Sequence, residues 1–187
     1  MLQYQADKGP AMARAAQLLK EAGIDPGQFT INVMNTTTFP GWGEVVESNI
    51  RALGFGTSLE TLASNLGTER FVKGEFMVAT APWNMLLDDP GEYLAREVRS
   101  DGAFNYGKWQ NPKLDSLFEE QDRTLDYGKR KALIDQIQQI VLDDNVYIPA
   151  VMRGYYHGYM PWLKNFPTNI PLSTDNLFRW EQVWLDR

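Results

Sequence analysis

The sequence predicts an α/β fold in which a mixed, mostly parallel sheet is flanked by helices. Three observations lead to this prediction. Helix-like and strand-like segments alternate through the first 82 residues, and longer amphipathic helices follow them. The composition, with 43% hydrophobic and 22% charged residues, is that of an ordinary globular protein. A chain of 187 residues is also long enough to bury a sizeable core in one domain or two small ones.

The N-terminal elements are predicted from the spacing of apolar residues. Residues 7–22 are expected to form a helix, because apolar side chains recur at helical spacing and Gly23 can end it. Residues 29–34 alternate between apolar and polar, which predicts a strand, and the polar residues 35–38 are expected to form its exit loop. A second helix, closed by Gly54, is expected after Pro40.

The same order then repeats. A second strand is predicted at 55–62, a short helix at 68–73 and a third strand at 76–81. Strands that alternate with helices form parallel sheets through right-handed crossovers, and such sheets bind ligands at the carboxyl ends of their strands. The sequence therefore points to residues 35–39 and 82–89 as the ligand-binding edge.

The second half of the chain is predicted to be mainly helical. Helices are expected at 90–99, 112–124 and 126–143. Residues 146–152 are apolar and predict a strand, which Pro149 would confine to a sheet edge or a bulge. The aromatic residues 153–187 show no sustained period and predict no regular element.

Charge and residue usage exclude several classes of function. There are 18 Lys and Arg residues against 24 Asp and Glu, so the net charge is −6 and nucleic acid is an unfavourable partner. The absence of cysteine excludes thiolate zinc sites and cysteine nucleophiles, and a single histidine leaves little for a metal site. We therefore expect no cofactor and no metal. The sequence as given shows no signal peptide and no apolar stretch of membrane-spanning length.

Two short patterns suggest catalysis only weakly. Gly102 to Lys108 matches the glycine and lysine spacing of a P-loop, but Trp109 stands where the magnesium-binding Ser or Thr is needed. Asp88 and Asp89 are adjacent carboxylates that would serve a hydrolase, yet sequence neighbours usually point apart. Their position before Pro90 favours capping of the next helix instead. An enzyme is therefore not expected.

Aromatic and polar residues near the predicted strand ends are the better candidates for function. Such side chains stack on a ligand and donate hydrogen bonds to it, although core packing is an equally good explanation for any one of them. The candidates are Trp83, Asn84, Asn105, Tyr106, Trp109, Arg153, Tyr155 and Tyr156.

The order of several motifs resembles a known family. Trp83 is followed by Asp89-Pro90-Gly91-Glu92-Tyr93-Leu94, by Asn105-Tyr106, and by Trp109-Gln110-Asn111-Pro112-Lys113-Leu114-Asp115. This succession resembles the C-terminal part of family 5 extracellular solute-binding proteins, the dipeptide, oligopeptide and nickel receptors of ABC importers. The resemblance implies a lobe of the type II periplasmic-binding-protein fold. It also implies a ligand-binding lobe over residues 1–174 and a return segment over 175–187 that would pack on an N-terminal lobe outside this sequence.

The resemblance also implies where a ligand would lie. The loop that contains Trp83, Asn84, Met85 and Leu86 resembles the family segment that faces the ligand, and Asn105, Tyr106, Trp109, Arg153 and Tyr155 resemble the walls of the cleft. Peptide-binding members place an aspartate three residues after this tryptophan, where it pairs with the α-amine of the peptide. This chain has Leu86 there, so the charge-assisted bond to a free ammonium group is not expected.

The function implied is binding of a small, peptide-like solute without chemistry. The full-length protein would be periplasmic or extracellular and membrane-associated, and would deliver its ligand to an ABC transporter permease. One lobe cannot enclose a ligand, so the isolated chain is expected to bind weakly and to self-associate through exposed aromatic residues such as Trp180 and Trp184. Two alternatives stay open: a stand-alone protein-interaction domain derived from such a lobe, and, last in rank, a hydrolase that uses Asp88 or Asp89.

Overall fold

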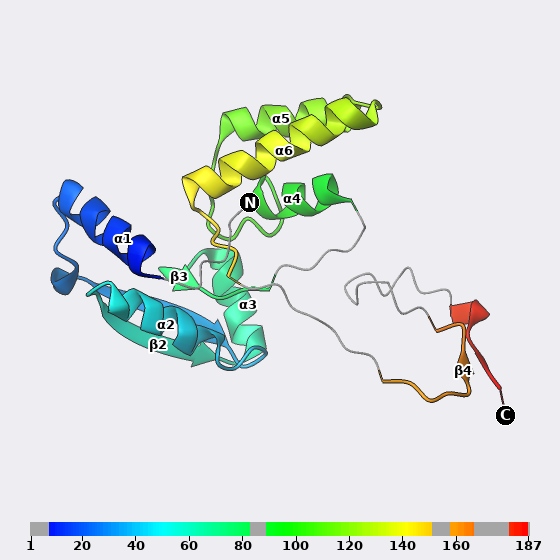
Figure 1. The fold of residues 1–187 in the computed structure, drawn as a ribbon, viewed down its shortest axis with the longest axis horizontal. Helices are drawn as coiled ribbons and strands as arrows, with labels where there is room; N and C mark the ends of the chain where they lie inside the picture. Colours follow the sequence, from blue (N-terminus) through cyan, green and yellow to red (C-terminus); the bar gives the residue numbers. More distant parts are fainter. Residues whose placement is uncertain (1–7, 83–88, 151–157, 167–179, 187) are drawn as a thin grey trace. The chain divides into compact units, whose positions relative to one another are not determined.

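The structure, a computed structural model, describes residues 8–82, 89–150, 158–166 and 180–186 (Figure 1). The chain forms two compact units, Met1–Pro82 and Trp83–Arg187. The boundary that the sequence suggested between residues 174 and 175 lies outside the described residues. Within the described residues, no helix combines the length and the apolar character needed to cross a membrane.

The first unit alternates helices and strands as predicted. Its regular elements are α1 (Gly9–Glu21), the 3-10 helix η1 (Pro26–Gln28), β1 (Thr30–Thr36), α2 (Trp42–Ala52), β2 (Gly56–Leu62), α3 (Ser64–Lys73) and β3 (Val78–Ala79). The helix predicted at 68–73 begins four residues earlier, and it ends at Gly74, which adopts a left-handed conformation with φ of 73°. The third strand is shorter than expected.

The three strands form a parallel sheet in the order β2-β1-β3. Central β1 pairs with β2 along its whole length, from Thr30 opposite Gly56 to Thr36 opposite Leu62. The prediction that residues 35–38 form the exit loop is therefore wrong for its first two residues, because Asn35 and Thr36 continue the ladder and are buried. Their polarity reflects their place at the carboxyl end of a buried strand.

Two glycines allow the helices to lie close to this sheet. A Cβ atom on Gly43 of α2 would lie 2.7 Å from Leu59 Cδ1 and 2.8 Å from Asn35 Cβ. A Cβ atom on Gly67 of α3 would lie 2.5 Å from Thr36 Cγ2. Both positions therefore require glycine for the observed packing against the carboxyl end of β1.

The described residues of the second unit form three α-helices, each close to its predicted range: α4 (Pro90–Val98), α5 (Pro112–Arg123) and α6 (Tyr127–Asp144). Their side-chain caps explain where they begin, because Asp89, Asn111 and Asp126 each accept hydrogen bonds from the first turn. Helices α5 and α6 lie side by side (Figure 1). The buried core between the three helices consists of Leu94, Val98, Leu114, Phe118, Ile134, Ile137 and Val141.

The end of the chain differs from the sequence prediction. Residues 146–150 belong to no strand, and residues 151 and 152 lie outside the described part of the chain. Pro149 has no N–H to donate to a ladder, and Ile148 is 78% exposed, so residues 146–150 have neither the pairing nor the continuous burial of a strand. Two short strands that were not predicted, β4 (Leu163–Lys164) and β5 (Trp184–Leu185), pair antiparallel, and the 3-10 helix η3 (Trp180–Gln182) precedes β5.

Candidate functional site

The carboxyl end of β1 lies where the sequence predicted a ligand-binding edge. Asn35 is only 1% exposed, and its Oδ1 accepts a hydrogen bond of 2.5 Å from Thr80 Oγ1, just beyond β3. Its Nδ2 donates to the carbonyl oxygen of Phe39 at 3.4 Å. These bonds tie the ends of two neighbouring strands to the following loop, so the edge is held in a defined shape before any ligand arrives.

The loop after β1 adds hydroxyl and aromatic groups to this edge. The hydroxyls of Thr38 and Ser64, the first residue of α3, lie 2.5 Å apart and share a hydrogen bond. Phe39 stacks on Trp42 with ring centroids 4.5 Å apart. Thr80, Ser64 and Trp42 were missed by the sequence analysis, since only the pairing of the strands brings the first two to the end of β1.

The predicted ligand-facing loop lies outside the described residues. This applies to Trp83, Asn84, Met85 and Leu86, and equally to Arg153 and Tyr155 of the predicted cleft wall and to Tyr156. Their roles stay predictions. The three remaining candidates, Asn105, Tyr106 and Trp109, are described and belong to one loop between α4 and α5.

Asp89 links the start of α4 to α6. Its Oδ1 accepts hydrogen bonds from the N–H groups of Gly91 (2.8 Å) and Glu92 (3.3 Å), which confirms the predicted cap. Arg130 Nη2 donates to both carboxylate oxygens, at 2.8 and 2.9 Å, and Arg130 Nε donates to Gln121 Oε1 at 3.0 Å. The hydrogen bond from Arg130 is the main reason why the pKa of Asp89 lies below its usual value. A carboxylate held ionised in this way is poorly suited to act as the general acid of a hydrolase.

Asn105 organises the loop between α4 and α5 from within. The residue is 4% exposed, and its Nδ2 donates to the carbonyl oxygens of Arg99 (3.1 Å) and Trp109 (2.7 Å). Its Oδ1 accepts from the N–H of Trp109 at 3.1 Å. Both amide hydrogens are thus committed to the loop. The sequence predicted Asn105 as part of the cleft wall. In the structure its side chain forms hydrogen bonds with the backbone of its own loop.

The aromatic residues of the loop are partly buried. Trp109 packs against the core of the three helices. Tyr106 meets Phe104 edge to face, with centroids 5.7 Å apart, and burial raises the pKa of its phenol. Phe104, which the sequence analysis did not select, is 38% exposed and lies over the guanidinium of Arg96, 4.9 Å from its Cζ to the ring centroid. Of these three rings, that of Phe104 offers the most surface to solvent.

One face of α4 carries a buried charged group beneath this loop. Arg96 Nη2 lies 3.4 Å from Glu97 Oε1, and Arg96 Nη1 lies 3.9 Å from Glu92 Oε1. Burial raises the pKa of Glu97, and Arg96 opposes that shift. Tyr147 donates its hydroxyl hydrogen to the backbone carbonyl of Glu97 at 3.0 Å, and burial raises the pKa of the Tyr147 phenol to about 12. These groups fix the base of the loop.

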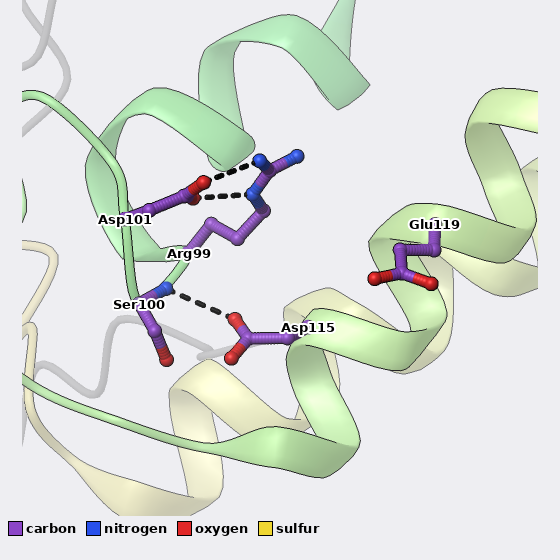
Figure 2. A pocket seen from close by; sticks show the side chains of 5 residues that line it. All are labelled: Arg99, Ser100, Asp101, Asp115 and Glu119. Carbon is purple, nitrogen blue, oxygen red and sulfur yellow. Dashed lines mark hydrogen bonds and ion pairs between the residues drawn. The ribbon is translucent and has the colours of Figure 1, made fainter.

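A small hollow of about 260 Å³ lies between the end of α4 and α5 (Figure 2). Figure 2 shows Arg99 turned toward Asp101, with two hydrogen bonds of 2.5 and 2.6 Å, and Ser100 N–H bonded to Asp115 at 2.9 Å. Glu119 lies one turn further along α5. Among the described residues, no group of three or more His, Cys, Asp or Glu side chains is arranged to hold a metal ion.

Comparison with known proteins confirms the resemblance inferred from the sequence. No family model matches the chain. The protein described as "Probable deoxycholate-binding periplasmic protein YgiS" of Escherichia coli is 26% identical over 174 residues, which cover 91% of this chain and 32% of that protein. The "Probable D,D-dipeptide-binding periplasmic protein DdpA" of the same organism is 26% identical over 136 residues, or 70% of this chain and 26% of that protein.

Solved structures show the same fold. The periplasmic binding protein DppA from Helicobacter pylori, an ABC transporter-associated protein in complex with the peptide STSA, matches with a TM-score of 0.63 and 25% identity over 71% of this chain and 27% of its own. OppA of Burkholderia pseudomallei matches with a TM-score of 0.65 and 25% identity over 75% of this chain and 28% of its own. The chain thus has the type II periplasmic-binding-protein fold, and the matches span between 26% and 32% of the length of these relatives.

Proposed function

We propose that this chain, a relative of the peptide-binding periplasmic receptors of ABC importers, supplies one side of a solute-binding cleft and recognises a small, peptide-like solute without chemistry. The observation that carries the proposal is that sequence and fold point to the same class of proteins, binding proteins of ABC transporters. The 26% identity extends over 91% of the chain, and the structural match reaches TM-scores of 0.63 and 0.65. Closure of the cleft and delivery to a permease would belong to a longer protein that is periplasmic or extracellular.

We propose ligand contacts in each of the two units, taken separately, and those of the first unit lie at the sheet edge. The edge around Asn35 and Thr38 is polar and fixed by hydrogen bonds, and it lies at the carboxyl ends of parallel strands, where such folds bind ligands. The other proposed contacts are Trp83, Asn84, Met85, Leu86, Tyr106, Trp109, Arg153 and Tyr155.

We further propose that the ligand is not anchored by a free ammonium group next to Leu86. An apolar side chain there cannot form the charge-assisted hydrogen bond that an aspartate would form. One relative is described as binding deoxycholate and another as binding D,D-dipeptides, so both an amphipathic carboxylate and a peptide belong in a first panel of ligands.

The experiment is an NMR titration of the chain, which detects binding in the millimolar range expected of half a cleft. Di- and tripeptides, N-acetylated peptides and deoxycholate are added in turn, and backbone amide shifts are followed. We expect shifts at the sheet edge around Thr38 and at Tyr106 and Trp109, larger for the acetylated than for the free peptides. Absence of shifts at these places for every compound would contradict the proposal, and tight one-to-one binding by calorimetry would contradict the single-lobe interpretation.

Leu86→Asp tests directly whether position 86 decides how the ligand's amino group is bound. The new carboxylate should strengthen binding of peptides with a free α-amine by about tenfold, which corresponds to one charge-assisted hydrogen bond. Leu125→Asp is the matched control, because Leu125 is 99% exposed in the loop between α5 and α6. Equal effects of the two substitutions would mean that only the net charge matters.

A further inference from the structure

The side-chain amide of Asn105 forms a closed set of hydrogen bonds inside the loop between α4 and α5. Its two amide hydrogens go to the carbonyl oxygens of Arg99 and Trp109, and its Oδ1 accepts from the N–H of Trp109. Its own N–H donates to the carbonyl of Gly102 at 3.0 Å, and its carbonyl accepts from Lys108 at 3.1 Å. One buried side chain therefore joins the first residue after α4 to the residue three positions before α5.

The rest of the loop is built around this residue. Gly102 lies so close to α4 that a Cβ atom would be 2.6 Å from the carbonyl oxygen of Arg96. Phe104 N–H donates to the same carbonyl at 3.0 Å, and its ring lies over the Arg96 guanidinium. Lys108 has a left-handed conformation with φ of 53°, which a non-glycine residue adopts only when its surroundings stabilise it. The two bonds from Asn105 to Trp109, directly after Lys108, supply that stabilisation.

We propose that Asn105 is a positioning residue for the ligand site and contributes to binding through Tyr106 and Trp109. With both amide hydrogens committed to backbone carbonyls, Asn105 has no donor left for a ligand. Its effect is to fix the backbone on either side of Tyr106, so that the two aromatic rings keep one arrangement whether or not ligand is present. The part of this inference that concerns ligand rests on the proposed function; the part that concerns the loop does not.

Asn105→Asp tests the inference with little change in shape. The new Oδ1 still accepts from Trp109 N–H, but a second carboxylate oxygen replaces the amide nitrogen and faces two carbonyl oxygens at 2.7 and 3.1 Å. Repulsion should open the loop when the carboxyl is ionised. When the carboxyl takes up a proton, its O–H can donate to one of the carbonyls, and the loop should partly close again. A general loss of stability would not produce this recovery at low pH.

The measurement is amide hydrogen exchange over residues 99–111, with each variant compared to the parent at the same pH. We expect Asn105→Asp to exchange at least about tenfold faster than the parent near neutral pH, and the ratio to fall as the pH is lowered toward 5. Asn105→Ser, which cannot make the three bonds at once, should accelerate exchange at both pH values. Asn32→Asp is the matched control, because the partner of the Asn32 amide is the Ser58 hydroxyl, which can donate instead.

The outcomes separate the two proposals. Exchange in Asn105→Asp equal to that of the parent near neutral pH would overturn the inference, as would an increase that does not change with pH. The positioning role is supported if the loop opens and a compound binds the variant at least about tenfold more weakly than the parent. The compound used is one that changes the amide chemical shifts of Tyr106 and Trp109 in the parent. Undiminished binding to the opened loop would refute the positioning role. A parent that binds no compound would count against the proposed function alone.

Discussion

Burial makes the ionised form of Glu97 costly to the fold. Its side chain is 8% exposed, and burial raises its carboxyl pKa above the usual value of 4.5. A raised pKa means that the folded chain holds the proton to higher pH than the unfolded chain. The associated stability is fully present below the unfolded pKa and is lost as the pH rises through the folded one. Glu97→Gln should therefore raise the melting temperature, and its advantage over the parent should grow from pH 4 to pH 7.

Glu69→Gln is the control, because the pKa of Glu69 is shifted in the opposite direction to that of Glu97. Glu69 is exposed, and a hydrogen bond from Lys73 lowers its pKa, so its contribution is present at neutral pH and is lost as the pH falls. The variant should melt slightly below the parent near neutral pH and approach it in acid. A Glu97→Gln variant with the same pH trend would show that the ion pair with Arg96 outweighs the cost of burial.

Helices α4, α5 and α6 meet at Arg130. This side chain, on α6, binds the Asp89 cap of α4 and the buried Gln121 of α5. Both charged groups are about one third exposed, so the ion pair is partly screened and we expect a cost of about 1–2 kcal/mol for Arg130→Gln. The lowered pKa of Asp89 means that this cost should be greatest near neutral pH and shrink in acid as the carboxyl takes up a proton. Urea unfolding at several pH values measures it.

Lys131→Gln provides the comparison on the same helix. Lys131 pairs with Asp135 within α6 only, and both side chains are more than half exposed. The substitution should leave the urea midpoint almost unchanged. If both variants lost the same stability, the junction of three helices would be no stronger than a surface ion pair.

The elements were predictable wherever local signals defined them. Prolines near the first turn predicted the starts of α4 and α5, and the carboxylates before Pro90 predicted the cap of α4, because these signals lie within one turn of the boundary. Helical spacing predicted the core face of α6, whereas the caps at Asn111 and Asp126 were not predicted. The sequence misplaced the end of β1 because pairing with β2 and Thr80 decides whether Asn35 is strand or loop. The strand predicted after residue 145 failed for the same reason, since an apolar run needs a partner to pair with.

The candidate site shows the same limit more strongly. The sequence located the carboxyl ends of the strands and the loop that contains Tyr106. It could not show that the Asn105 amide donates to backbone carbonyl oxygens or that the Ser64 hydroxyl forms a hydrogen bond with that of Thr38. These contacts depend on how the chain folds back on itself. The composition of a loop indicates which groups are available, whereas their partners depend on tertiary structure.

At the scale of the whole molecule, exposed aromatic and apolar side chains predict self-association. Trp162 is 45% exposed, Trp184 50% and Leu185 52%. Trp162 directly precedes β4, and the other two form β5. Exposed apolar side chains of this kind favour contact between copies of a chain. We expect the weight-average mass from light scattering to rise above the 21.4 kDa of the monomer as concentration increases. The double variant Trp162→Ser/Trp184→Ser should lower the association constant by about tenfold or more, since each ring buries a large apolar area.

Phe29→Ser is the control for this test. Phe29 is also 50% exposed, but it lies before β1 in the first unit. Its replacement removes a similar exposed ring without touching the β4–β5 pair. A strict monomer at high concentration would contradict the prediction, and an equal effect of Phe29→Ser would show that association is unspecific. An effect of the double variant without an effect of Phe29→Ser would place the contact between copies at the β4–β5 pair.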